Sequence, residues 1–299
     1  DHPYILKIYI KKEREKMASS SSYEYHPEGS VSVVTGAASG IGRSICHHLI
    51  KLGARDIIAV DLDISKLRKA FNDKGINKNT NVTLLEADVS SEMNIRRVIQ
   101  KTETEIGQID AFFCNAGILG GGFWGGGPEV SNDEWNKMWQ INVMQSVYTA
   151  RHLFPLYKDR GGGALMITGS AAGLLTLAGN LPYSVTKHAA VAVAEWLRMS
   201  YNADNINVSC LCPQGVNTNM LAGHDPTTVW GGGELLSPDR VAEITIDAMT
   251  QNTFMVLPHP EVGAFFKFKA KDYDLWLQKM MKVHQNNIAL IQQNKRPRP

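Results

Sequence analysis

Three side chains suited to proton transfer lie in the second half of the sequence. Tyr183 and Lys187 stand four positions apart at the start of an apolar stretch, residues 181–197, and Ser170 lies thirteen residues before Tyr183. Residues at i and i+4 share one face of a helix, so the phenol and the ammonium can converge on one point. Tyrosine and lysine at the edge of an apolar helix often only cap or snorkel, so this pair needs support from elsewhere in the chain.

A glycine-rich turn supplies that support. Gly36, Gly40 and Gly42 follow a short apolar run and lead into a helix that we expect to begin at Ile41. Glycines here let the backbone approach a pyrophosphate, which the free N–H groups of the helix start hold. The turn therefore predicts a dinucleotide site, with Ser39 and Ile41 as further contacts.

An acidic residue ends the next apolar run. Asp61 lies nineteen residues after Gly42, at the spacing where a carboxylate accepts hydrogen bonds from the adenosine ribose and repels a 2′-phosphate. Ser39 and Leu62 occupy the positions where a basic side chain would welcome that phosphate, and Arg43 is the nearby cation. We therefore expect NAD as the cofactor, with NADP as the less favoured alternative.

Seven short apolar runs alternate with longer segments of helical pattern. Strands buried on both faces have this composition, and the intervening segments are long enough for crossover helices. The pattern predicts an α/β fold, a single doubly wound Rossmann domain with a seven-stranded, mainly parallel sheet. The expected strands are residues 31–35, 57–61, 82–87, 111–115, 164–168, 206–211 and 254–257.

Polar residues or glycines follow these strands in succession. Asp88 comes after the third strand, and Asn115 and Gly117 come after the fourth. Each alone is also typical of a helix cap or a turn. Because ligands of such sheets bind outside the carboxyl ends of the strands, the series favours one binding edge.

Composition and charge narrow the class of partner. The 299 residues include 31 Lys and Arg and 29 Asp and Glu, a net charge of +2, with 43% apolar residues. This balance gives no electrostatic case for nucleic acid or an anionic membrane, so we expect a small-molecule substrate. No run reaches the roughly 18 apolar residues of a membrane span.

The four cysteines lie in apolar segments and indicate reduced thiols in the cytoplasm. Cys210 and Cys212 lack a second ligand pair at zinc-finger spacing, and we expect no metal site. The cysteines are Cys46, Cys114, Cys210 and Cys212.

The ends of the chain differ from its middle. We expect residues 1–28 to be a disordered N-terminal extension, residues 29–260 the Rossmann domain, and residues 261–299 a helical extension with a tail. Residues 1–16 place an apolar stretch before the charges, the reverse of a signal peptide. Beyond the last strand we predict one amphipathic helix with an apolar stripe typical of core or subunit contact. The stripe contains Phe265, Phe266, Trp276, Met280 and Met281.

Taken together, these motifs resemble those of the short-chain dehydrogenase/reductase family, over residues 31 to 257. The resemblance implies reversible hydride transfer between a nicotinamide cofactor and an alcohol or carbonyl, and a homodimer or homotetramer. The matching motifs are T-G-x-x-x-G-x-G at Thr35 to Gly42, Asp88 and Val89, Asn115–Ala116–Gly117, the helix asparagine Asn142, Ser170, and Y-x-x-x-K at Tyr183 and Lys187.

The resemblance also implies roles for four residues. Tyr183 is the general base in alcohol oxidation, and the Lys187 ammonium lowers the phenol pKa from its free value of about 10. Lys187 also holds the nicotinamide ribose, and Ser170 binds the substrate oxygen. Asn142 helps to retain a water that relays protons from the lysine.

One loop departs from the family pattern. Where the family commonly has Pro-Gly after the sixth strand, this chain has Pro213, Gln214 and Gly215, followed by Val216 and Thr218. The glycine comes one place late. We expect Pro213, Gly215, Val216 and Thr218 to contact the nicotinamide, although the pattern does not fix the geometry of the loop.

The loops that shape the substrate pocket are mostly apolar, which favours a hydrophobic secondary alcohol or ketone. Residues 120–127, with Phe123 and Trp124 among glycines, fit either a mobile flap or an exposed insertion. Two alternatives to an NAD-dependent dehydrogenase remain open. One is an NADPH-dependent carbonyl reductase, and the other is a catalytically silent dinucleotide-binding scaffold.

Overall fold

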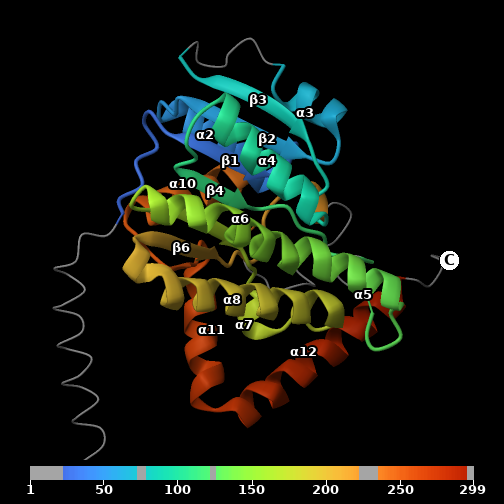
Figure 1. The fold of residues 1–299 in the computed structure, drawn as a ribbon. Coiled ribbons are helices and arrows are strands. Elements are labelled where there is room, and N and C mark those ends of the chain that lie inside the picture. The colour runs from blue at the N-terminus through green and yellow to red at the C-terminus, as the bar shows by residue number, and fades with distance from the viewer. Residues whose placement is uncertain (1–22, 73–78, 122–125, 222–234, 295–299) are drawn as a thin grey trace, which may run out of the picture.

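A seven-stranded parallel sheet forms the centre of the molecule in the computed structural model, which describes residues 23–72, 79–121, 126–221 and 235–294. The strand order is β3-β2-β1-β4-β5-β6-β7, with helices on both faces (Figure 1). The chain thus reverses direction across the sheet between β1 and β4. This confirms the predicted doubly wound α/β fold.

The strands match the predicted apolar runs to within two residues at each end. The seventh is shorter than expected, because only Met255 and Val256 pair with Cys210 and Leu211 of the preceding strand. The strands are β1 Val31–Thr35, β2 Asp56–Asp61, β3 Asn81–Glu86, β4 Ala111–Cys114, β5 Gly163–Thr168, β6 Ile206–Leu211 and β7 Met255–Val256.

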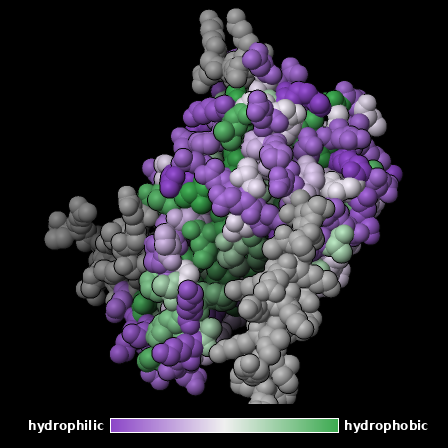
Figure 2. Space-filling model, turned by 90° about the vertical axis from the view of Figure 1, so that its left-hand side faces the viewer, coloured by the Kyte–Doolittle hydropathy of each residue, from purple (hydrophilic) through white to green (hydrophobic). Residues whose placement is uncertain are grey.

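The two faces of the sheet bury separate apolar clusters. Val33 and Ile58 point into one cluster and their neighbours Val34 and Ile57 into the other, as the two-residue period of a strand requires. The first cluster is covered by α4 Glu92–Glu105, α6 Gln145–Asp159 and α8 Leu181–Tyr201, and the second by α2 Gly40–Lys51, α3 Ile64–Ala70 and α10 Pro238–Thr250. Outside the clusters, one side of the molecule is largely hydrophilic, with hydrophobic side chains gathered across its middle (Figure 2).

Five of the described α-helices begin with a side-chain cap. Asp63, Ser91 and Ser237 accept hydrogen bonds from N–H groups at the starts of α3, α4 and α10. Ser131 does the same for α5 Asn132–Trp139, and Asn180 for α8. At the start of α2, by contrast, the Ser39 side chain makes no cap bond and the first turn holds no acidic residue.

The last six residues of the expected N-terminal extension pack against the sheet. Tyr25 is fully buried against the α2 side of the sheet, and its hydroxyl shares a 3.0 Å hydrogen bond with Ser32 Oγ. The Tyr23 carbonyl accepts a hydrogen bond from Asn207 Nδ2. Residues 23–28 therefore belong to the folded domain, because two aromatic rings find partners there, while residues 1–22 lie outside the described part of the chain.

The C-terminal segment is two helices, α11 Pro260–Lys271 and α12 Tyr273–Asn294, rather than the single helix predicted. The chain leaves helical geometry at Asp272, whose φ of −149° and ψ of 89° are extended. The turn lets Trp276 fold back against Phe268, with ring centroids 6.0 Å apart. Figure 1 shows the two helices meeting at an angle below the body of the domain.

Candidate active site

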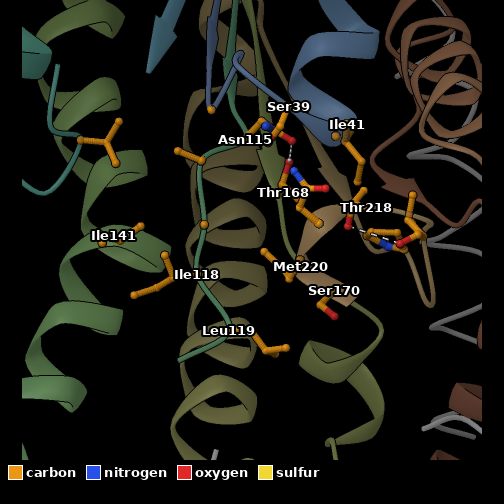
Figure 3. Close-up of a pocket in the computed structure, with 18 of the residues that line it drawn as sticks. Ser39, Ile41, Asn115, Ile118, Leu119, Ile141, Thr168, Ser170, Thr218 and Met220 are labelled. Carbon is orange, nitrogen blue, oxygen red and sulfur yellow. Dashed lines mark hydrogen bonds between the residues drawn. The ribbon is translucent and has the colours of Figure 1, made fainter. Parts of the chain in front are cut away.

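A cavity of about 370 Å³ opens at the carboxyl ends of the strands. It collects residues from six strand ends, from the start of α2 and from α8, and Figure 3 shows several of these side chains around one space. Predicted residues that line it are Gly36, Ser39, Gly40, Ile41, Asp61, Leu62, Asp88, Val89, Asn115, Ala116, Gly117, Ser170, Tyr183, Lys187, Pro213, Val216 and Thr218.

Ser170, Tyr183 and Lys187 meet on one side of this cavity. Their exposed fractions are only 6%, 8% and 4%. The Tyr183 hydroxyl is hydrogen-bonded to Ser170, and Lys187 Nζ lies 5.7 Å from the centroid of the Tyr183 ring. Lys187 Nζ donates a 2.8 Å hydrogen bond to the Thr168 carbonyl at the end of β5. The sequence pattern thus assembles into one buried group of titratable side chains.

Burial controls the protonation of this group. It raises the pKa of Tyr183, and the hydrogen bond from Ser170 lowers that pKa by a smaller amount. The net direction is opposite to the lowering by Lys187 that the sequence predicts, because both side chains are removed from water. Burial also lowers the pKa of Lys187 to about 8. The group is therefore poised to hold a proton on the phenol near neutral pH.

Asn142 lies in a π-helical turn, Gln140–Met144, between α5 and α6. It is 2% exposed, and its Oδ1 accepts a 2.9 Å hydrogen bond from the Ile118 N–H. Its Nδ2 donates to the Ile118 carbonyl at 3.0 Å and to Thr186 Oγ1 at 3.1 Å. The wider turn aims the amide at the segment after β4, which it joins to α8. Single π turns inside helices are frequent at functional sites.

The glycine turn fits a pyrophosphate. Gly36 and Gly40 have φ values of +66° and +53°, a backbone region that favours glycine. A Cβ at Gly36 would lie 2.9 Å from the Ala116 Cα. The uncapped N–H groups of α2 face the same space, where the helix dipole favours an anion. The residues present therefore suit the phosphates of a dinucleotide.

Asp61 is held at the far end of the cavity by the backbone of the same turn. Its Oδ2 accepts a 3.0 Å hydrogen bond from the Ala38 N–H, and its Oδ1 accepts one of 3.3 Å from the Asp63 N–H. The carboxylate lines the cavity together with Ser39 and Leu62. An anionic side chain thus lines the cavity at the end of β2.

Three strand ends are tied together behind the cavity. Asn115 Nδ2 donates a 2.9 Å hydrogen bond to the Thr35 carbonyl, and Thr35 Oγ1 accepts from the N–H groups of Asn115 and Ala116 at 2.9 and 3.0 Å. Thr168 Oγ1 donates to Asn115 Oδ1 at 3.4 Å. These bonds fix β1, β4 and β5 relative to one another at the point where the strand order reverses.

Three predicted site residues support the cavity without lining it. Gly42 lies behind Gly36, where a Cβ would come within 2.3 Å of the Gly36 carbonyl oxygen. Gly215 packs against Leu235, whose Cδ2 would lie 2.6 Å from an added Cβ. Asn142 is the third. Their roles are close packing and positioning.

Apolar lining residues were missed by the sequence reasoning, because a hydrophobic residue in a loop carries no motif. Thr168 and Gln214 were also missed as site residues. Thr168 could have been found from the sequence, because it is a polar residue at the very end of a predicted strand. The missed apolar residues are Ala87, Ile118, Leu119, Ile141, Met220 and Leu221.

Two predicted pocket loops are described only in part. Phe123 and Trp124 of the glycine-rich stretch lie outside the described residues, as do residues 222–234 after β6. Next to the first gap, Gly126 pairs with Asn180, and its carbonyl accepts a 3.0 Å hydrogen bond from the Leu181 N–H. The edge of the glycine-rich stretch therefore lies at the start of α8.

The four cysteines are buried, free thiols. Cys210 Sγ and Cys212 Sγ lie 3.7 Å apart. Among the described residues, no three His, Cys, Asp or Glu side chains are grouped as metal ligands. Within the same part of the chain, no helix has the length and apolar character needed to cross a membrane.

Comparison with known sequences identifies relatives over most of the chain. The family described as short chain dehydrogenase matches residues 30–228. Short chain aldehyde dehydrogenase 1 of Euphorbia lathyris is 31% identical over 232 residues, which are 74% of this chain and 78% of that protein. The 1-deoxy-11-beta-hydroxypentalenate dehydrogenase of Streptomyces exfoliatus is 29% identical, over 84% of this chain and 90% of that protein. The 3beta-hydroxysteroid dehydrogenase 2 of Eggerthella lenta is 28% identical, over 65% and 74%.

Solved structures share the fold. A short chain dehydrogenase/reductase from Burkholderia phymatum in complex with NAD has a TM-score of 0.72 at 25% identity, covering 84% of this chain and 96% of that chain. A short-chain dehydrogenase from Sphingobium yanoikuyae in complex with NADPH has a TM-score of 0.70 at 21% identity, covering 85% and 95%. The chain belongs to the short chain dehydrogenase family and is an NAD(P)-dependent oxidoreductase that acts on alcohol or ketone groups.

Proposed function

We propose that this protein oxidises a hydrophobic secondary alcohol to a ketone with NAD, and that Tyr183 is its general acid and base. The observation that carries the proposal is the buried group of Ser170, Tyr183 and Lys187 in the cavity that also holds Asp61. The side chains at one end of this cavity can transfer a proton to or from the substrate. The Asp61 carboxylate at the other end repels a 2′-phosphate.

The side chains divide the work at the reacting carbon. The Ser170 hydroxyl donates a hydrogen bond to the substrate oxygen and holds it beside the Tyr183 hydroxyl. Tyr183 takes the alcohol proton in oxidation and returns it to the carbonyl oxygen in reduction. The Lys187 ammonium, fixed by the Thr168 carbonyl, stabilises the phenolate that oxidation requires. When bound, the nicotinamide supplies the hydride acceptor.

The binding residues fit a dinucleotide at the glycine turn. The N–H groups of α2 hold the pyrophosphate, and Asp61 accepts hydrogen bonds from the adenosine ribose. Lys187 and the loop from Pro213 to Thr218 hold the nicotinamide end. Asn142 keeps the segment after β4 in place beside Lys187.

The substrate end of the cavity supports an apolar substrate. Ile118, Leu119, Ile141, Met220 and Leu221 line it, and Figure 3 shows Ile118, Leu119 and Met220 around the space beside Ser170. Two relatives are named for a hydroxypentalenate and for a hydroxysteroid, which are alcohols on a hydrocarbon framework. We infer a substrate of the same character.

Cofactor preference tests the role of Asp61. We expect NADH to bind at least about tenfold more tightly than NADPH, a difference of about 1.4 kcal/mol, because the carboxylate repels the 2′-phosphate. Asp61→Asn should reduce this ratio to below about threefold, measured by energy transfer from tryptophan to the reduced nicotinamide. Asp63→Asn, which alters the neighbouring helix cap, is the control and should keep the preference. A wild-type preference for NADPH would favour the carbonyl reductase alternative.

Removing the Tyr183 hydroxyl tests the proton transfer. Tyr183→Phe should lower the turnover number by about 10²–10⁴-fold while the affinity for NADH stays within twofold. Because burial raises the pKa of Tyr183, alcohol oxidation by the wild type should quicken as pH rises above neutrality. Tyr148→Phe, which removes a hydroxyl bonded to Gln140, is the matched control. Unchanged turnover in Tyr183→Phe would exclude this phenol as the base. A wild-type protein that binds NADH but turns over no alcohol or ketone would favour the silent scaffold.

The stability of Lys187→Met should depend on pH relative to the wild type. The wild-type lysine has a pKa of about 8 when folded and 10.5 when exposed, so folded wild type gains stability as pH rises through this window. Lys187→Met cannot titrate there. Its free energy of unfolding relative to the wild type should therefore fall by about 3 kcal/mol between pH 7 and pH 10.5.

Urea unfolding at several pH values measures this difference. Lys51→Met, at the exposed end of α2, is the control and should differ from the wild type by a constant amount. A constant difference for Lys187→Met as well would show that burial does not depress the lysine pKa.

We also propose a cytoplasmic homo-oligomer. The free, buried cysteines support the location. A surface groove between α6 and α8, lined by Phe154, Trp196 and Tyr201, supports assembly. Large apolar side chains are exposed there, because Trp196 is 58% exposed and Met199, also on α8, is 74% exposed.

Disrupting this groove should separate the subunits. Trp196→Glu should convert the oligomer to a monomer, because a charge would be buried at the contact. Light scattering coupled to size-exclusion chromatography gives the mass, and circular dichroism checks the fold. Leu52→Glu, at an exposed site after α2, is the control and should leave the mass unchanged. The same mass for both variants and the wild type would place any contact elsewhere.

A further inference from the structure

The loop after β6 carries a side chain that the mechanism above does not use. Gln214 stands where the family commonly has glycine, and it lines the cavity together with Ser170 and Tyr183. The Pro213 carbonyl accepts a 2.8 Å hydrogen bond from the N–H of Ala171, the residue after the catalytic serine. Gln214 is therefore anchored directly beside the place where the substrate oxygen is held.

A buried histidine fixes the backbone on both sides of this residue. His259, at the start of α11, is 3% exposed. Its Nδ1 accepts a 3.1 Å hydrogen bond from the Gln214 N–H, and its Nε2 lies 3.1 Å from the Gly215 carbonyl oxygen. These partners require the neutral ring with its hydrogen on Nε2. The Gly215 carbonyl also accepts from the Leu236 N–H at 3.2 Å, so the loop is held in one conformation.

The side chain of Gln214, in contrast, is incompletely satisfied. Its Oε1 is buried, and no donor reaches it within the described part of the chain. A buried acceptor without a partner costs free energy, and native structures seldom leave one unless a ligand completes the bond. Oε1 can accept a hydrogen bond but cannot donate one, so it cannot bind a ketone oxygen. The missing partner is a hydroxyl or an N–H group.

We propose that Gln214 is a specificity residue that accepts a hydrogen bond from a second hydroxyl of the substrate, close to the carbon that is oxidised. The preferred substrates are then hydrophobic alcohols with a neighbouring hydroxyl group. His259 is a positioning residue that holds Gln214 against the cavity. The inference rests on the proposed function. In that function Ser170 and Tyr183 bind the reacting oxygen of the substrate, so Gln214 must bind a different group of the substrate.

Binding of two matched probes tests the proposal without turnover. 1-Phenyl-1,2-ethanediol has the second hydroxyl and 1-phenylethanol lacks it. With NADH present, neither alcohol is oxidised, and calorimetry gives the dissociation constant of each. We expect the wild type to bind the diol about tenfold more tightly. Gln214→Met, which keeps the length of the side chain but removes the acceptor, should bring the ratio close to one by weakening diol binding.

Matched variants separate this effect from general damage to the cavity. Leu119→Met changes another lining residue and should preserve the tenfold ratio. His259→Leu removes both bonds to the loop and should reduce the preference for the diol, whereas His259→Asn keeps an acceptor for the Gln214 N–H and should restore part of it. Circular dichroism confirms that each variant is folded.

Two results would overturn the inference. One is equal binding of the two alcohols by the wild type, or a tenfold ratio that persists in Gln214→Met. The other is a loss of NADH affinity in Gln214→Met with the diol ratio unchanged, which would assign the amide to the cofactor. If the wild type binds the diol selectively but oxidises neither alcohol with NAD, the proposed reaction fails while the binding role of Gln214 stands.

Discussion

The hydrogen bond from Lys187 Nζ to the Thr168 carbonyl is the contact on which the site depends. It joins α8 to the end of β5 and holds an ammonium where it is only 4% exposed. Burying that charge is unfavourable, and the depressed pKa of the lysine is the measure of this cost. The same arrangement places Tyr183, one turn earlier on the helix, against Ser170 and puts the Lys187 ammonium beside the Tyr183 ring.

Burial changes the electrostatic role expected for that lysine. In water a neighbouring ammonium lowers the pKa of a phenol, but here desolvation acts on both groups and raises the pKa of Tyr183. The hydrogen bond from Ser170 lowers the pKa of Tyr183. The same Ser170 hydroxyl would bind the substrate oxygen. Substrate contacts and phenol protonation are therefore linked through one hydroxyl group.

Sequence reasoning predicted the parts of the site that depend on local pattern. The glycine turn, Asp61 and the i,i+4 pair of Tyr183 and Lys187 are local, because each requires only a strand end or a helix start. The π-helical turn at Asn142 was not predictable, since it depends on bonds to Ile118 and Thr186, 24 and 44 residues away. The break between α11 and α12 likewise depends on the packing of Trp276 against Phe268.

The departure at Pro213–Gln214–Gly215 shows how such distant contacts alter a familiar loop. A glycine at 214 would leave the backbone free to turn, whereas here His259, contributed by a segment 45 residues further on, specifies the conformation through two hydrogen bonds. Gly215 follows one position later, and the Leu235 side chain packs against it. The backbone of the loop is thus fixed by contacts outside the motif, which leaves the Gln214 side chain available to the cavity. Motif residues at the strand ends position the reaction, and the chain-specific loop beside them is where substrates can be distinguished.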